Sequence, residues 1–479
     1  MSAVSVIEQE PIYPQVPAGL PLIFVVSNDT AVAGELKVKF IAEVHVSSTT
    51  PVDLSNTNDL VASFKSTPNN AGVGMFDFRA VLENYVSADN MAADGSKYKL
   101  DITDAQHRHP MHLINQFSLN NNSVKYFAIK FAVEYLGADD GVNPVDPNVV
   151  RTQSGTEINS DAFMIVNSYI KHTDELYLFN DDFGYNFQDF YPASNIPFSS
   201  VRKLFTNAPT TQYANDNDYG TVALFIPDLS PANNAVNVQF NYYDSSNSFL
   251  NTETVTKDVS TGAYLTWDTD IKKQMIFLGC YPANLRNWST IFQGLVSAGT
   301  IHGGRIQVTI NDNSSGSIRP LNIYVNCPDL KGYEPIRLCW LNQWGAWDYY
   351  TFNKKSTKSI KTKGSTYNQL EGTWNETAYR LDSYRGGKKT FRVNSTENIK
   401  MNTDYVTEDE NIMFEELINS PEVYELTGFK TDVLTAFNTY VTPVRLTTSS
   451  FTRKTVANDK LIQYTFEIEK TKKLRTQSV

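Results

Sequence analysis

The residues best suited to hold a metal ion form one histidine cluster. His107, His109 and His112 lie within six positions, and imidazole nitrogens are ligands that Zn²⁺ and other transition metals accept. Pro110 interrupts any helix that would align the three rings, and a loop gives them no fixed geometry. We therefore expect a solvated loop whose histidines titrate near neutral pH, and we predict no metal site in the chain.

Acidic side chains form a second candidate, a calcium loop. Asp216, Asp218 and Gly220 alternate with other residues as in an EF-hand, where hard oxygen ligands bind Ca²⁺. The twelfth position of such a loop needs a bidentate glutamate, and this chain has Pro227 there. Two shorter acidic pairs are Asp139-Asp140 and Asp181-Asp182. We expect ordinary turns at all of these places.

Motifs of nucleophilic and nucleotide-binding enzymes are absent from the sequence. It contains no GxSxG elbow, no GxxxxGK[ST] phosphate loop and no GxGxxG after a strand. The three cysteines form no CxxC pair, and their scarcity fits assembly in a reducing cytoplasm: Cys280, Cys327 and Cys339. We predict that the protein is not an enzyme and binds no cofactor. A polysaccharide hydrolase with two paired acids stays an alternative, because acidic residues are plentiful.

Two aromatic groups are candidate interface elements. One lies in a polar stretch that resembles a long loop: Phe183, Tyr185, Phe187, Phe190 and Tyr191. The other surrounds a turn at Gly345: Trp344, Trp347 and Tyr349. Exposed aromatic side chains stack on sugars or form the energetic centre of a subunit contact, whereas buried ones are core. Both interpretations stay open for both groups.

The charge balance argues against a protein whose main task is to bind DNA. The formal net charge is −11, whereas DNA-binding proteins present a basic face to the phosphates. Basic residues do collect near the C-terminal end: Lys354, Lys355, Lys358, Lys361, Lys363, Lys470, Lys472, Lys473 and Arg475. A solvated hairpin or a lysine-protected edge strand explains them most simply. We keep Lys472, Lys473 and Arg475 as candidate contacts to an acidic neighbour.

The pattern of apolar residues predicts no export leader and no membrane span. The first residues lack a basic segment followed by an apolar one. No apolar run approaches the ~20 residues that a membrane-spanning helix needs. We therefore expect no contact with a membrane.

Apolar residues alternate with polar ones along much of the chain, which predicts a mostly β protein. The alternation is clearest at 36–46, 127–135 and 306–310, and a period of two buries one face of a strand. A chain of 479 residues is too long for one hydrophobic core. We predict tandem β-sandwich or barrel-like domains with a few short helices.

The predicted domains follow shifts in composition. They are an N-terminal β-domain (1–136), a linker rich in Gly, Pro and acids (137–160), a middle β-domain (161–330) with one helix at 284–296, and a C-terminal β-domain (331–479) with a capped helix at 407–419. Thr407 and Glu410 form the capping box of the last helix, in which each side chain satisfies a free backbone amide. Ser420 and Pro421 end it.

Several segments of the chain carry a resemblance to a known class of proteins. They are 339–352 (CWLNQWGAWDYYTF), 407–410 (TEDE), 417–424 (LINSPEVY), 458–465 (NDKLIQYT) and the loop at 68–78. In this order they resemble segments of structural proteins from tailed bacteriophages, especially marine and Bacteroidetes-type phages. The matching residues are structural, so no functional residue is carried over. The region 161–300 contains no matching segment.

The resemblance implies a virion protein of the tail, baseplate or neck, assembled in the cytoplasm of the host bacterium. Such a protein would contact copies of itself and other virion proteins, with a symmetric homo-oligomeric ring as the expected arrangement. One alternative is a receptor- or glycan-binding tail protein, which would expose aromatic side chains beside polar groups. Another alternative is a capsid decoration protein.

Overall fold

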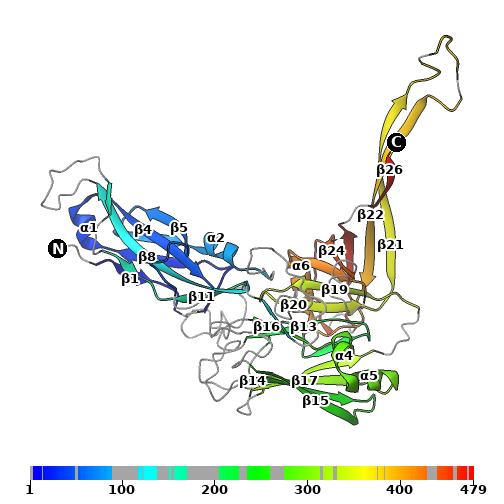
Figure 1. Ribbon diagram of the computed structural model, residues 1–479, viewed down its shortest axis with the longest axis horizontal. Coiled ribbons are helices and arrows are strands. Elements are labelled where there is room, and N and C mark those ends of the chain that lie inside the picture. Colours follow the sequence, from blue (N-terminus) through cyan, green and yellow to red (C-terminus); the bar gives the residue numbers. More distant parts are fainter. Residues whose placement is uncertain are drawn as a thin grey trace.

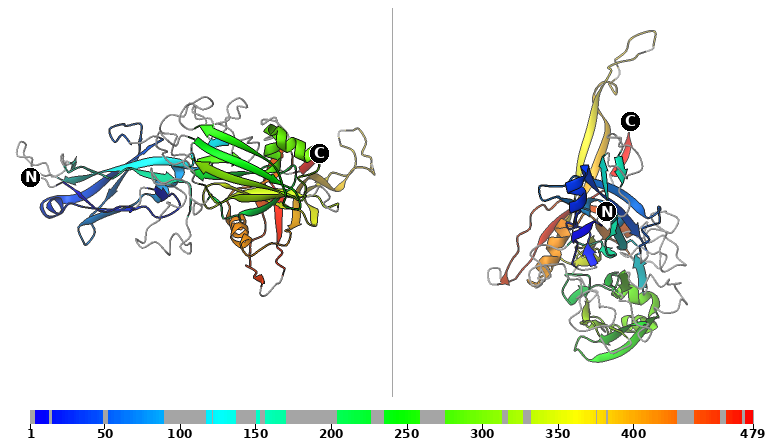
Figure 2. Two further views of the ribbon diagram at one scale, coloured as in Figure 1. Left: turned by 90° about the horizontal axis from the view of Figure 1, so that it is seen from below. Right: turned by 90° about the vertical axis from the view of Figure 1, so that its left-hand side faces the viewer.

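The chain is mostly β, as predicted, with several sheets and few, short helices (Figure 1). The computed structural model describes residues 4–12, 15–48, 52–88, 117–120, 122–136, 150–152, 156–169, 204–225, 235–258, 275–312, 317–326, 332–374, 376–381, 383–428, 440–456, 461–471 and 474–478. A β-sandwich with the N-terminus lies at one end of the molecule, and a long β-hairpin projects at the other (Figures 1 and 2).

Two sheets pack face to face in the N-terminal sandwich. The smaller sheet has the order β1 (Val6–Gln9), β3 (Ile23–Ser27), β6 (Val73–Asp77). The larger sheet has the order β2 (Gln15–Pro17), β11 (Phe163–Val166), β8 (Val124–Leu136), β4 (Leu36–Ser47), β5 (Leu60–Ser66), and β9 (Val150–Thr152) and β10 (Ile158–Asn159) also pair with β8. Short helical turns complete this part: α1 (Asp29–Gly34), α2 (Arg79–Leu82) and η1 (Glu83–Tyr85).

Aromatic side chains fill the space between these two sheets. Most positions of the alternation predicted for β4 are buried: Val38, Phe40, Ala42, Val44 and Val46. Leu36 is exposed, and Ile41 and His45 on the other face are buried as well. The ring of Phe24 on β3 lies within 7 Å, centre to centre, of four phenylalanine rings: Phe78, Phe127, Phe131 and Phe163. Such rings bury large apolar areas, so the alternation alone is enough to build a sandwich core.

Strand pairing crosses the boundaries that composition suggested. β9 and β10 belong to the segment predicted as a linker, yet both pair with β8. β11, from the predicted middle domain, pairs with β2 and β8. In the opposite direction, β7 (Phe117–Asn120) pairs with β16 (Met275–Gly279). Strands of two to four residues are too short to show a period, so no sequence pattern predicted these pairings.

The middle of the chain forms a five-stranded sheet covered by two helices. Its order is β12 (Thr211–Ala214), β18 (Leu321–Val325), β17 (Arg305–Asp312), β14 (Ala235–Tyr243), β15 (Phe249–Asp258). The single helix predicted at 284–296 is two helices, α4 (Pro282–Trp288) and α5 (Thr290–Ser297). Ser289 separates them because its backbone is extended and its hydroxyl accepts a hydrogen bond from the amide of Phe292, which caps α5.

A small three-stranded sheet joins the N-terminal, middle and C-terminal parts. It consists of β13 (Thr221–Phe225), β16 and β7. The hydrophobic cluster around it takes residues from all three predicted domains, including Tyr126, Phe277 and Trp347. We call this region the junction.

The C-terminal sheet carries the projecting hairpin. Its order is β20 (Trp347–Phe352), β19 (Ile336–Leu341), β23 (Val423–Leu426), β24 (Val441–Leu446), β25 (Thr465–Lys470), β22 (Gly387–Asn402), β21 (Ser356–Gln369), and β26 (Leu474–Ser478) also pairs with β22. The helix predicted at 407–419 is present as α6 (Glu410–Asn419) and begins three residues later. The carboxylate of Glu410 accepts from the amide of Thr407, so half of the predicted capping box forms.

Candidate functional site

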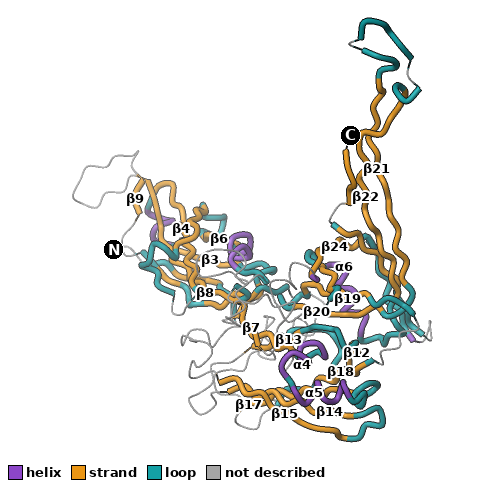
Figure 3. Tube along the Cα trace, turned by 45° about the vertical axis from the view of Figure 1, so that its right-hand side comes forward, coloured by secondary structure: helices purple, strands orange, loops and turns teal. Residues whose placement is uncertain are grey.

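The most distinctive surface of the molecule is the hairpin of β21, β22 and their connection, residues 356–402, which we call the β-arm. It stands away from the rest of the chain in Figure 1, in the right-hand view of Figure 2 and in Figure 3. β21 has 14 residues and β22 has 16, and their side chains are exposed along most of their length. Burial begins only at Asn398, where β22 enters the sheet beside β25.

The outer half of the β-arm consists of two strands alone. β25 pairs with residues 398–402 of β22, and β26 pairs with residues 392–395. Beyond Arg392, only β21 contacts β22 by strand pairing within the described part of the chain. A β-bulge at Ser365/Thr366 marks this point, and a bulge increases the twist of a ribbon. An isolated two-stranded ribbon is marginally stable in water, so the outer β-arm lacks the support that a third strand would give.

The tip of the β-arm, residues 370–386, displays large apolar side chains. Each of five is at least two-thirds exposed: Leu370, Trp374, Tyr379, Leu381 and Tyr384. The tip nevertheless has internal hydrogen bonds, because the amide of Thr373 donates to the carbonyl of Arg380 at 2.9 Å and its hydroxyl accepts from the amide of Arg380 at 3.0 Å. These two hydrogen bonds join Thr373 to Arg380 and bring the two sides of the connection together at that point.

Charge on the β-arm is opposite in sign to that of the chain as a whole. Residues 356–402 contain nine lysines and arginines against four acids, a net charge of +5, so the remaining residues carry −16 of the total of −11. Some of the lysines are paired near the base, as in the 2.7 Å contact of Lys358 with Glu334. That contact raises the pKa of Lys358 above its usual range.

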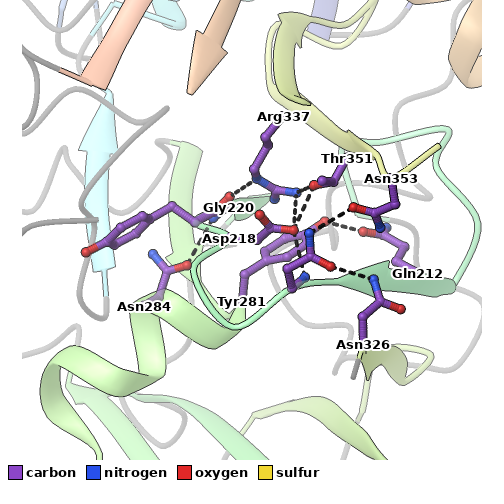
Figure 4. Close-up of polar contacts among 11 residues, drawn as sticks. Gln212, Asp218, Gly220, Tyr281, Asn284, Asn326, Arg337, Thr351 and Asn353 are labelled. Carbon is purple, nitrogen blue, oxygen red and sulfur yellow. Dashed lines mark hydrogen bonds and ion pairs between the residues drawn. The ribbon is translucent and has the colours of Figure 1, made fainter. Parts of the chain in front are cut away.

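A buried polar network holds the junction together (Figure 4). Arg337 on β19 is 4% exposed, and its Nη1 lies 3.3 Å from the Asp218 carboxylate. The same nitrogen donates to the Thr351 hydroxyl at 2.7 Å, and that hydroxyl donates to Asp218 at 2.7 Å. The rings of Tyr281 and Tyr349 lie 4.9 and 5.2 Å from the guanidinium carbon, where a cation is attracted to the ring face.

The network explains the role of the acidic residues 216–220, where we expected a turn and not a calcium loop. Asp218 neutralises Arg337, and the backbone amides of Asn215 and Asp218 form a turn around it. The carboxylate of Asp216 accepts a hydrogen bond from the Nε2 of His302 at 2.8 Å. Both carboxylates thus contact basic groups of the protein, and the expected turn is confirmed. Among the described residues, no three His, Cys, Asp or Glu side chains lie close enough to hold a metal ion.

Two cavities adjoin the C-terminal sheet. The larger, about 470 Å³, lies where Gly19 and Tyr169 face Gln343 and the end of α6. The smaller, about 270 Å³, lies between β12 and the start of α6 and is lined by tyrosines, carboxamides and two acids. One of these acids is Glu410, and burial raises the pKa of its carboxyl above the usual range.

The structure separates the aromatic residues that the sequence grouped as interface candidates. Trp344, Trp347 and Tyr349 are each at most 5% exposed and belong to the junction cluster. Of the two interpretations left open for this group, the structure supports core for these three side chains. They are therefore not available as a surface of the subunit. The aromatic group at 183–191 lies outside the described residues, as do the histidine cluster at 107–112 and the lysines at 472 and 473. Arg475 lies on β26, opposite Asn394 of the β-arm.

Sequence reasoning missed the main features of both the β-arm and the junction, which are the aromatic tip and the buried Arg337. The lysines of β21 were attributed to a solvated hairpin, and the structure places them on one, but the aromatic residues of its tip were not connected with them. A signal was present, because Trp374, Tyr379 and Tyr384 lie in a polar, glycine-containing stretch between two strand-like segments. Arg337 carried no signal, since nothing in the sequence pairs it with Asp218.

Comparisons with known proteins do not assign the chain to a family. No family model and no curated protein matches it. Among solved structures it is similar to native α-2-macroglobulin of E. coli, with 8% identity and a TM-score of 0.16 over 83% of this chain and 22% of that chain. For trypsin-activated α-2-macroglobulin from E. coli the identity is 8% and the TM-score 0.14, over 84% of this chain and 41% of that chain. The chain thus spans less than half of either protein, and similarities this weak carry no argument about fold or function.

Helices in the described parts of the chain are all too short or too polar to cross a bilayer.

Proposed function

We propose that this protein is a structural subunit that assembles through its β-arm, and that the assembly is part of a tailed-phage virion, in its tail, baseplate or neck. The observation that carries the first half is the exposed, aromatic, basic tip on a ribbon that extends past its last bracing strand. The second half rests on the sequence resemblance of segments such as 339–352 and 417–424 to phage structural proteins.

The composition of the β-arm tip favours a protein contact. Tryptophan, tyrosine and arginine are the residues that most often carry the binding energy of an interface, and the tip has Trp374, Tyr379, Arg380, Tyr384 and Arg385. Isolated exposed apolar residues are ordinary on any surface, but a group of this size on one loop is typical of an interaction site. Two hydrogen bonds between Thr373 and Arg380 restrict the backbone of the tip. Less conformational entropy is therefore lost when this part of the tip docks on a partner.

The partner that these charges fit best is a second copy of the chain. A β-arm of net charge +5 would approach a body of net charge −16, and opposite charges accelerate and orient association. The contact is heterologous, because the β-arm of one copy meets a different surface of the next. Repeated contacts of that kind close into a ring when the rotation between copies allows it.

The test is the oligomeric state of the full chain with and without the tip. Sedimentation velocity over a range of protein concentrations would show oligomers for the native sequence. In W374A/Y379A we expect the dissociation constant to rise by about 100-fold, because two hot-spot side chains of an interface together contribute roughly 3 kcal/mol. Both side chains are exposed, so the melting temperature should stay unchanged.

A matched control removes two equally exposed apolar side chains from the N-terminal sandwich. Leu36 and Met75 are 67% and 61% exposed, and L36A/M75A should assemble like the native protein. A stable contact between copies should have a dissociation constant below about 100 μM. A native chain that stays monomeric at that protein concentration would therefore contradict assembly through the β-arm. Absence of the chain from purified phage particles by mass spectrometry would contradict the virion assignment alone.

A further inference from the structure

The smaller cavity combines a rigid polar wall with exposed aromatic rings. It lies beside the junction network, and Gln212 belongs to both (Figure 4). The amide nitrogen of Gln212 donates to the carbonyl of Pro209 at 3.1 Å, and its amide oxygen accepts from the hydroxyl of Tyr281. Tyr281 in turn packs against Arg337. The buried ion pair thus fixes one side of the cavity.

A chain of carboxamides orients two further polar groups of the cavity. Asn215 donates to the Oδ1 of Asn353 at 2.9 Å and accepts from the Nδ2 of Asn326 at 2.8 Å. Both partners line the cavity. In Asn353 the amide oxygen is hydrogen-bonded, and in Asn326 the amide nitrogen is. The NH₂ group of Asn353 and the amide oxygen of Asn326 are therefore available to a ligand. An available donor and an available acceptor in one cavity suit a ligand that carries hydroxyl groups, because a hydroxyl both donates and accepts.

Tyrosine rings form the open side of the cavity. Tyr213 is 62% exposed and Tyr405 is 60% exposed. Tyr213 stacks on Tyr324 at 5.5 Å, with an angle of 27° between the rings, so its orientation is held from below. An exposed ring with a fixed face offers an apolar platform, and its hydroxyl offers a polar edge.

The lining residues exclude other classes of ligand. The described lining residues include Asp404 and Glu410 but no lysine or arginine, so a phosphate or another anion would be repelled. Asp404 is already paired with Lys354 at 3.2 Å, which leaves one unpaired acid and makes a cation site weak. Among the described lining residues, Met413 and the tyrosine rings supply apolar surface that is interspersed with carboxamides and acids, so a wholly apolar ligand would leave those polar groups unsatisfied.

We propose that this cavity is a binding site for a neutral saccharide, seated as a single ring against the carboxamides with a tyrosine on its face. The volume of about 270 Å³ is slightly below the range of roughly 300–1,000 Å³ that is typical of pockets for drug-sized ligands, so it accommodates one sugar residue of a longer chain. Carboxamides and a carboxylate satisfy hydroxyl groups, and the tyrosine ring covers the C–H face of the sugar. The site is distinct from the β-arm and does not depend on assembly.

The test uses the full chain and a panel of named probes. Saturation-transfer NMR with glucose, galactose, mannose, N-acetylglucosamine and N-acetylgalactosamine would report direct contact, with inorganic phosphate and N-acetylneuraminic acid as anionic probes. We expect at least one neutral sugar to bind and both anions to fail. Y405A and N353A should each weaken that sugar by about tenfold, the effect of one lost contact of roughly 1.4 kcal/mol.

The matched control is Y379A, which removes an equally exposed tyrosine from the β-arm tip and should leave sugar binding unchanged. Failure of every neutral sugar would overturn the proposal, as would binding that Y405A and N353A both leave intact. Preferential binding of phosphate or N-acetylneuraminic acid would replace it with an anion site. Because Y379A affects assembly and Y405A does not, loss of one function is distinguishable from loss of the other.

Discussion

The junction and the β-arm place similar residues in opposite environments. Both contain tryptophan, tyrosine and arginine. At the junction Trp347 is 2% exposed and Arg337 is 4% exposed, and on the β-arm Trp374 is 70% exposed. The junction satisfies its arginine internally with Asp218. Aromatic composition alone therefore does not identify an interface. The decisive feature is whether a segment has enough neighbouring strands to bury its own side chains.

Topology explains why the two regions differ. The junction hairpin 336–352 has β23 on one side, and β13 and β12 pack against β20. On the side of the β-arm tip, β22 loses β25 as a neighbour at residue 398 and β26 at residue 392. From there to the tip, β21 is its one paired strand among the described residues. The junction is therefore expected to determine the stability of the subunit, whereas the β-arm is expected to determine its association. Variants in each region should affect one property and spare the other.

The largest effect on stability is expected from breaking the buried ion pair. D218A leaves Arg337 buried and unpaired, and the loss of one partner of such a pair costs about 3–5 kcal/mol. Chemical denaturation of the purified chain would measure the change. The control is R445A, which removes an exposed 3.0 Å pair with Glu469, where a surface pair contributes at most about 1 kcal/mol. Equal losses in both variants would show that the junction network has no special role.

The next effect is a pH dependence that comes from Asp348. Burial raises the pKa of this carboxyl to about 6 in the folded chain, so the folded state holds a proton that the unfolded state has lost. Stability therefore falls as the pH rises through the window of about 4 to 6, by up to about 3 kcal/mol for two pKa units. D348N removes the titrating group. Denaturation at pH 4.5 and at pH 7.5 should show the native chain losing more stability on the rise than D348N does, and parallel losses would contradict this origin.

The smallest effect compares two glycines with nearly the same backbone. Gly345 has a φ of +75° at the junction, and Gly387 has a φ of +76° at the end of the β-arm tip. A Cβ added at Gly345 would lie 2.0 Å from the carbonyl oxygen of Asn167, and one added at Gly387 would meet nothing within 4 Å. G387A should cost about 1 kcal/mol for the left-handed conformation alone. G345A should cost roughly 2 kcal/mol or more, because its neighbour is backbone.

Equal melting temperatures for G345A and G387A would show that the turn at Gly345 is free to move away from Asn167.

The sequence predicted the strands better than it predicted their partners. The alternation in β4, β8 and β17 was enough to place those strands, although β8 and the middle of β4 are buried on both faces and not on one. The short strands β7, β9 and β10 have no period, and they are the ones that pair across predicted boundaries. Strand order depends on contacts between residues far apart in sequence, and a local pattern does not encode them.

The candidate sites were predictable only where composition is unusual. The lysine-rich stretch around Lys361 drew attention to the β-arm, although its significance lies in the tip. One helix was predicted at 284–296 because an apolar stripe runs from Leu285 to Leu295, but the capping hydroxyl of Ser289 divides it in two. The carboxamide cavity unites Gln212, Asn326, Asn353 and Glu410 from four separate segments. Only the folded arrangement brings them together.

The most direct test of assembly through the β-arm is a site-specific cross-link from its tip. A photoreactive phenylalanine analogue at position 374 replaces an exposed tryptophan and should leave the fold intact. The account predicts that irradiation of the assembled protein gives a covalent dimer, whose cross-linked peptide comes from the acidic body of a second copy. The same analogue at the exposed control position 75 should give little dimer. Cross-links confined to the same chain, or equal dimer yields from both positions, would contradict the account.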